Sequence, residues 1–293
     1  MDSMIWVCGN RTPKSIRENK AYTFFDPFVE INEKKNINHL NRFWSEYVCQ
    51  YYVFMNKIKS DIVTFCHDTR IVKPQCIDAE KILDEGSIQY YCVWGDDFTK
   101  ETDKLGNPID QNKLYRNIYH DIVNKTNQPM FMYEDFIEYL ESQKILALSL
   151  IKEYAKLDIQ NFPNREMYSC SWKTFVEMQT FLHGYVEFVE KKHDLKGDVR
   201  RYKEMFKELV IPHYQKSIRD VDEDVSQLTF SNKLYQSDER FTLTMSESTE
   251  YGFDSCNNVW RIFSYQIEYL IGMFISCRPH FTVENQSSAI IYV

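Results

Sequence analysis

The stretch Asp61–Arg70, DIVTFCHDTR, carries the strongest information about the fold. Its first part, IVTFC, is apolar or β-branched, which is typical of a buried strand. The strand pattern stops abruptly at four polar side chains in succession, namely His67, Asp68, Thr69 and Arg70. In sheets with parallel strands, ligands bind at the carboxyl ends of the strands. The stretch therefore predicts either a strand that delivers a reactive loop or a buried strand that ends in an ordinary polar turn.

The segments around this stretch alternate between strand and helix patterns. Met4–Asn10 (MIWVCGN) and Ile88–Gly95 (IQYYCVWG) each predict a short buried strand. Between them, residues 39–58 carry apolar side chains at three- and four-residue spacing, which predicts one helix with Asn38 as its N-cap. The order strand, helix, strand, strand predicts an α/β fold with a central, mainly parallel sheet flanked by helices.

Helical patterns dominate the second half of the chain. They cover residues 113–124, 133–154, 173–192, 198–209 and 257–276, with one strand pattern at 240–246. No linker composition interrupts the chain, so we expect a single domain over residues 1–293. Residues 1–130 would form its α/β part and residues 131–293 its helix-rich part.

Composition and charge exclude several classes of protein. The 293 residues include 35 Lys and Arg against 43 Asp and Glu, a net charge of −8, which argues against a nucleic-acid-coating surface. No signal-peptide pattern opens the chain, and the apolar run Tyr269–Cys277 is shorter than the roughly 20 residues that span a bilayer. We expect a cytoplasmic protein without a transmembrane segment, with peripheral membrane contact and oligomeric state left open. The eight cysteines form no CxxC pair and are expected to be reduced, mostly buried thiols.

Polar clusters follow three of the predicted strands: Asn10-Arg11-Thr12, His67-Asp68-Thr69-Arg70 and Asp96-Asp97. If these strands are parallel, the clusters meet at one edge of the sheet. Asp68 would suit Mg²⁺ or Mn²⁺, which needs few protein carboxylates when a diphosphate supplies other oxygens. Arg70 would neutralise that diphosphate, and His67 would bond a hydroxyl or phosphate. The alternative is a polar turn in which Asp68 caps the next element.

The remaining acidic candidates have equally plain structural alternatives. Asp96 and Asp97 would bind a metal or accept a proton, or simply form a Gly-Asp-Asp turn. Asp135 is a candidate base, although Glu134 and Asp135 would also suit the start of a helix through its dipole. No GxGxxG, GxxxxGK[ST], HExxH or GxSxG motif occurs, so the common nucleotide-binding and hydrolase fingerprints are absent from the sequence.

The run NINHLNRFWSEYVCQYYVFMNKIKSDIVTFCHDTRI (residues 36–71) resembles a family of glycosyltransferase-like proteins of bacterial capsule and O-antigen clusters, largely described as a domain of unknown function. The matched positions are Asn36, Asn38, Asn41, Glu46, Asp61, His67 and Arg70. MFMYEDFIEYLES (residues 130–142) and RIFSYQIEYLIGMFI (residues 261–275), with Arg261 and Glu268, resemble later segments of that family. The chain departs from it at Asp68-Thr69 and at Gln50-Tyr51-Tyr52.

The resemblance implies a GT-A-type transferase that takes a UDP- or GDP-linked sugar and a glycan acceptor in surface or virion polysaccharide synthesis. The departure at Asp68-Thr69 makes the loop similar to the Asp-containing motif of metal-dependent GT-A transferases, so we expect Mn²⁺ or Mg²⁺ on Asp68. We expect the donor to be held by Arg11, His67, Arg70 and Asp96. Asp97 is the first choice of catalytic base and Asp135 the second. The alternatives are a carbohydrate-active hydrolase with paired carboxylates and a non-catalytic glycan- or nucleotide-binding protein.

Overall fold

A computed structural model describes residues 2–9, 11–29, 35–92, 129–143, 167–210, 212–213, 262–276, 281–285 and 289–292. The chain divides into two compact units. Unit 1 combines residues 1–98, 161–186 and 263–293, and unit 2 combines residues 99–160 and 187–262. Each unit draws on segments far apart in the sequence, and the single domain with parts 1–130 and 131–293 stays a prediction.

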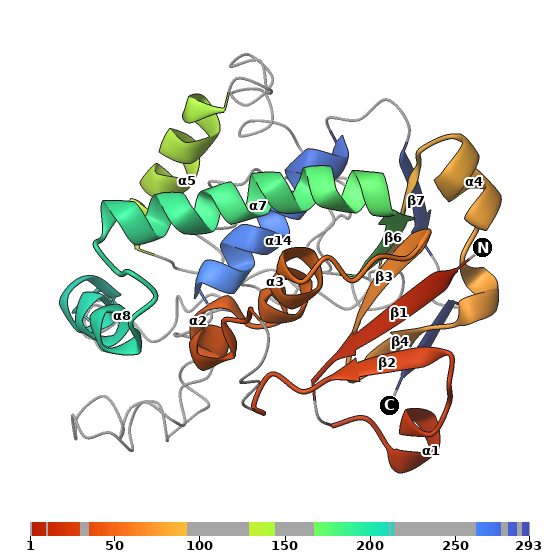
Figure 1. Ribbon diagram of the computed structural model, residues 1–293. Coiled ribbons are helices and arrows are strands. Elements are labelled where there is room, and N and C mark those ends of the chain that lie inside the picture. The colour runs from red at the N-terminus through yellow and green to blue at the C-terminus, as the bar shows by residue number, and fades with distance from the viewer. Residues whose placement is uncertain are drawn as a thin grey trace, which may run out of the picture. The chain divides into compact units, whose positions relative to one another are not determined.

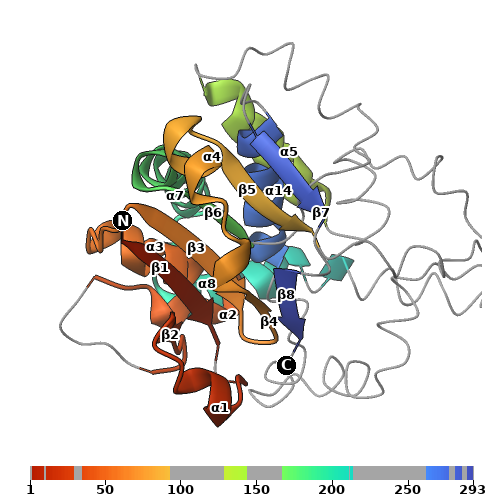
Figure 2. The same cartoon turned by 90° about the vertical axis from the view of Figure 1, so that its right-hand side faces the viewer.

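Unit 1 is built on an eight-stranded sheet (Figure 1). Its main path is β2-β1-β3-β6-β5-β7, and β4 joins β3 to β8. Figure 2 shows β4 and β8 side by side at the edge of this path. The strands are β1 (Ser3–Cys8), β2 (Tyr22–Phe25), β3 (Ile62–His67), β4 (Arg70–Val72), β5 (Ile88–Cys92), β6 (Tyr168–Ser171), β7 (Phe281–Asn285) and β8 (Ile290–Tyr292).

The sheet is mixed, which corrects the prediction of a mainly parallel one. β1 is parallel to β2 and β3, and β5 is parallel to β7. β6 is antiparallel to both β3 and β5, and β4 is antiparallel to β3 and β8. The four residues of β6, YSCS, are too short and polar to predict a strand. Since β6 opposes both of its neighbours, β1, β3 and β5 still run in one direction and end at the same edge.

Helices lie against one face of this sheet (Figure 1), and aromatic side chains make the contacts. Trp6 of β1 meets Tyr52 of α3 (Tyr47–Met55) edge to face, with 6.2 Å between ring centroids. Phe65 of β3 stacks on Phe175 of α7 (Trp172–Lys192) at 5.3 Å. Beside them, Trp44 of α2 (Asn41–Trp44) stacks at 5.0 Å on Phe263 of α14 (Ile262–Ser276). The short helices of this unit are α1 (Lys14–Arg17) and α4 (Ala79–Asp84).

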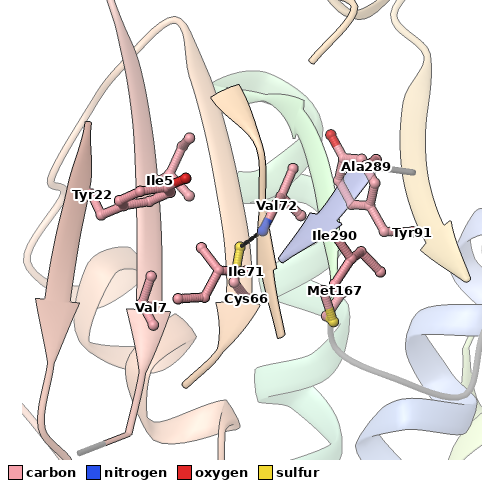
Figure 3. Packing of buried hydrophobic residues seen from close by; sticks show 10 residues of the cluster. All are labelled: Ile5, Val7, Tyr22, Cys66, Ile71, Val72, Tyr91, Met167, Ala289 and Ile290. Atoms are coloured by element: carbon pink, nitrogen blue, oxygen red, sulfur yellow. Dashed lines mark hydrogen bonds between the residues drawn. The ribbon is translucent and has the colours of Figure 1, made fainter. Parts of the chain in front are cut away.

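A second apolar cluster lies against β1, β3, β4 and β8 (Figure 3). Cys66 is at its centre and accepts a hydrogen bond from the Val72 N–H, 3.4 Å from its sulfur. Burial raises the pKa of the Cys66 thiol to about 12, so it stays protonated and unreactive. Its other members are Ile5, Val7, Tyr22, Ile71, Tyr91, Met167, Ala289 and Ile290. Among the described cysteines whose side chains are placed, all five are free thiols, and four of these are buried.

The helix predicted over residues 39–58 is broken at Ser45. A 3₁₀ turn at Asn38–Leu40 leads into α2, and α3 starts after Ser45. Ser45 has φ +48°, a conformation that residues other than glycine rarely adopt. Because no glycine marks the position, the sequence gives no signal for the break. The N-cap prediction is also wrong: Asn38 is the first residue of the turn and Ile37 precedes it as the cap.

Unit 2 contains α5 (Met130–Ser142), α8 (Val199–Met205), a π-helical turn at Phe206–Val210 and the last residues of α7. The predictions of helices at 173–192 and 198–209 are confirmed within a few residues. The helix predicted over residues 133–154 instead starts at Met130 and ends at Ser142. The patterns at 113–124 and 240–246 lie outside the described residues. No helix in the described part of the chain has the length and apolarity needed to cross a bilayer.

Candidate functional site

The carboxyl ends of β1 and β3 are joined by a network centred on Asp68. Cys8 pairs with His67 in the sheet, which places the next residues of each strand side by side. The Asp68 N–H donates to the Cys8 carbonyl at 3.0 Å, and the Thr12 hydroxyl donates to the Asp68 carbonyl at 3.0 Å. The predicted meeting of the first two polar clusters is therefore present in the structure.

The Asp68 carboxylate binds Arg11 through three hydrogen bonds. Its Oδ2 accepts the backbone N–H and Nε–H of Arg11, both at 3.0 Å, and its Oδ1 accepts Nη2–H at 2.9 Å. Asp68 is 4% exposed, whereas the Arg11 side chain is 69% exposed. We call Gly9, Arg11, Thr12 and Asp68 the strand-end clamp. Its acid is buried and its guanidinium faces outward.

Gly9 makes room for this arrangement. Its φ is +127°, and a Cβ added to it would lie 2.3 Å from Asp68 Oδ2. The carboxylate therefore packs directly on the glycine backbone, and a side chain at this position would displace it.

The charge of Asp68 depends on this environment. Burial favours the neutral acid, but the hydrogen bonds and positive charge of Arg11 outweigh burial and hold the pKa of Asp68 below its ordinary value. A lowered folded-state pKa stabilises the fold above the unfolded pKa, which is about 3.9 for Asp. That contribution is lost as the pH falls through the folded-state value.

We therefore expect the stability advantage of the wild-type chain over Asp68→Asn to be full at about pH 6 and to shrink below about pH 4. Urea unfolding at a series of pH values measures it. Asp198→Asn is the matched control, because Asp198 holds Arg200 through the same backbone N–H, Nε and Nη2 groups on an exposed surface. A pH-independent difference between wild type and Asp68→Asn would contradict the assignment.

The contacts of Asp68 bear on whether its carboxylate could hold a metal ion. Both carboxylate oxygens are bonded to Arg11, so a cation would have to displace the guanidinium. Within the described ranges, no group of three or more His, Cys, Asp or Glu side chains is placed to hold a metal ion. Metal binding by Asp68 stays a prediction.

A second cluster is centred on His67, the last residue of β3 and the residue before Asp68. The Glu46 carboxylate bonds His67 Nδ1 at 3.2 Å through Oε1 and accepts the Ser45 hydroxyl through Oε2. His67 Nε2 is buried and has no hydrogen-bond partner. Ser45, 4% exposed, holds the positive φ described above. Strained backbone and an unsatisfied buried nitrogen each cost free energy, and such features gather at functional sites.

Sequence reasoning missed this cluster as a unit. In the sequence, Glu46 is only a position that matches the resemblance and has no predicted role. Ser45 was not marked, because its strain has no sequence signature. A Glu at a helix start, 21 residues before a His at a strand end, becomes a contact only when α3 packs on the sheet.

The other predicted site residues lie in different parts of the chain's structure or outside the described residues. Arg70 starts β4 and pairs with His67 across the tight turn, so it stays beside the clamp. Asp96 and Asp97 lie outside the described residues, although β5, the strand before them, ends at the same edge of the sheet.

Asp135 belongs to unit 2 and takes part in a buried ion-pair cluster. It is 1% exposed, and its oxygens bind His193 Nε2 at 2.5 Å and Lys192 Nζ at 2.8 Å. Lys192 also pairs with Glu138. Because α5 starts at Met130, Asp135 is not in the first helical turn, and the helix-dipole interpretation is wrong. These contacts are those of a structural acid that holds α5 to the end of α7.

A solved structure resembles this chain over 97% of its length. It is described as the apo structure of the WbbM bifunctional glycosyltransferase, with a TM-score of 0.57 and 14% sequence identity. The chain has a glycosyltransferase-like fold. It spans 44% of that protein's length, so the likeness covers less than half of the bifunctional protein. No family model matches the chain, and no curated protein matches it.

Proposed function

We propose that this chain is a glycosyltransferase that moves a sugar from a nucleoside-diphosphate sugar to a hydroxyl of a glycan acceptor. The glycosyltransferase-like fold supports the reaction class. The observation that carries the proposal is the exposed Arg11 guanidinium, fixed by buried Asp68 where β1 and β3 end. This edge is where sheets of this kind bind their ligands.

In the proposed reaction, the acceptor oxygen bonds to the anomeric carbon of the sugar. The bond from that carbon to the diphosphate oxygen breaks, and its electron pair stays on the diphosphate. Arg11 would stabilise the charge that develops there, because a fixed guanidinium bonds two phosphate oxygens at once. Asp97 remains the proposed acceptor of the hydroxyl proton.

His67 would contribute to sugar recognition at the same edge. With Glu46 bonded to Nδ1, the ring nitrogen that remains is Nε2, which has no partner. A sugar hydroxyl that reaches Nε2 after a small movement of the ring would satisfy it and remove the cost of an unpaired buried group. Glu46 then serves to orient the imidazole, as carboxylates commonly do for functional histidines.

A thermal-shift panel tests the proposed function. We expect a nucleoside diphosphate, either UDP or GDP, to raise the melting temperature by several degrees at 100 times its Kd, since that saturation adds about 2.7 kcal/mol. The free nucleoside should shift it far less. No shift with any nucleoside diphosphate, with or without Mn²⁺, would contradict the proposal and favour the hydrolase or the non-nucleotide binding protein.

A further inference from the structure

We propose that Asp68 is a positioning residue rather than a metal ligand, and that the Arg11 guanidinium it holds binds a diphosphate without a divalent cation on Asp68. This inference rests on the proposed function and names the chemistry of its donor site. It reverses the role expected for Asp68 from its type and place at a strand end.

The first argument is the direction of the two charges. The carboxylate is buried on Gly9, and its oxygens are occupied by three N–H groups of Arg11. The guanidinium is more than two-thirds exposed. A ligand that approaches the clamp therefore meets the cation first. The acid lies behind it, where its main effect is to hold the guanidinium plane.

The second argument is the charge of the segment that carries Arg11. RTPKSIR, residues 11–17, contains three cationic side chains and no acidic one. Lys14 is exposed and makes only a loose pair with Glu18 at 3.7 Å. Arg17 Nε–H donates to the Thr12 carbonyl at 2.8 Å, which ties the helix α1 to the clamp. The segment therefore brings three cationic side chains to the end of β1, which suits a diphosphate.

The third argument is preorganisation. An arginine side chain loses rotamer entropy when it is fixed. Asp68 fixes Arg11 before a ligand arrives, with Nε and Nη2 held in one plane. An interaction whose geometry exists beforehand costs less to form. Removal of the Asp68 charge should therefore weaken diphosphate binding even though Asp68 itself does not touch the ligand.

Calorimetric titration of the full chain with inorganic pyrophosphate in EDTA tests this inference. We expect wild type to bind, Arg11→Gln to bind at least about tenfold more weakly, and Arg11→Lys to fall between them, because a lysine keeps the charge but loses the fork. Asp68→Asn should bind severalfold more weakly, with equal affinity in EDTA and in Mn²⁺. Arg200→Gln and Asp198→Asn repeat the same changes on the exposed pair and should leave affinity unchanged.

Pyrophosphate binding that needs Mn²⁺, with that need abolished in Asp68→Asn, would overturn the inference and make Asp68 a metal ligand. Equal affinity of wild type and Arg11→Gln, or no binding in EDTA, would overturn it as well. Arg11 is mostly exposed, so Arg11→Gln stays informative if Asp68→Asn does not fold. The proposed function is judged separately by the nucleoside diphosphates, because a chain that binds them only with a metal would keep the function and lose this inference.

Discussion

Gly9→Ala is expected to lower the free energy of unfolding by about 3 kcal/mol or more and to abolish pyrophosphate binding. The new Cβ would lie 2.3 Å from Asp68 Oδ2 and 2.4 Å from its Cγ, and the backbone would have to keep φ +127° with a side chain present. Since Asp68 is held by Arg11, it has no easy way to withdraw. Urea unfolding followed by tryptophan fluorescence measures the loss.

Gly86→Ala separates the two causes. Gly86 also has a positive φ, +66°, but a Cβ there would meet nothing within 4 Å. Gly86→Ala should lower the free energy of unfolding only through backbone strain, by about 1–2 kcal/mol. If Gly9→Ala is no worse than Gly86→Ala and retains pyrophosphate binding, the close packing of Asp68 on Gly9 is wrong.

Gln50→Ala is expected to have the second large effect, a loss of about 3–5 kcal/mol. Gln50 lies on α3 with no exposed surface, and its Oε1 accepts the Tyr168 hydroxyl at 2.7 Å and Gln179 Nε2–H at 2.8 Å. Both donors are themselves buried, on β6 and α7. Truncation would remove the acceptor that both donors share, keep only the long 3.4 Å bond from Gln179 Nε2–H to the Tyr168 hydroxyl, and open a cavity between the helices and the sheet.

Gln143→Ala is the control, because Gln143 directly follows α5 in a partly exposed position and donates to Ser142. It should change stability by less than about 0.5 kcal/mol. The urea midpoints of the two variants, compared at equal m-values, measure the difference in stability. A loss below about 1 kcal/mol for Gln50→Ala would show that this network does not hold α3 and α7 to β6.

The strands with clear apolar runs were predictable from the sequence. β1, β3 and β5 lie where their patterns place them, because burial on both faces leaves a continuous apolar run. Their common direction brings together the polar residues that follow β1 and β3, as predicted for parallel strands, but the contact of Arg11 with Asp68 was not itself predicted. The sequence does not predict β6, because Ser169 and Ser171 interrupt its apolar pattern. Pairing with β3 and β5 stabilises this strand.

The finer features of the site depend on tertiary contacts. The sequence shows an acid at a strand end but not which positive group contacts it. It therefore predicts that Asp68 binds a metal ion, whereas in the structure the Asp68 carboxylate binds Arg11. The positive φ at Ser45 falls between α2 and α3, and no glycine in the sequence marks the place. Asp135 was predicted to lie at the start of a helix, whereas in the structure it pairs with His193 and Lys192, nearly 60 residues later in the chain.

Hydrogen exchange with and without a saturating nucleoside diphosphate tests the central claim most directly, because it reports where the ligand binds. We predict slowed exchange in peptides that cover residues 8–13 and 66–70, at the ends of β1 and β3, and the loss of that protection in Arg11→Gln. Protection confined to other peptides, or protection of these two that persists in Arg11→Gln, would contradict the account.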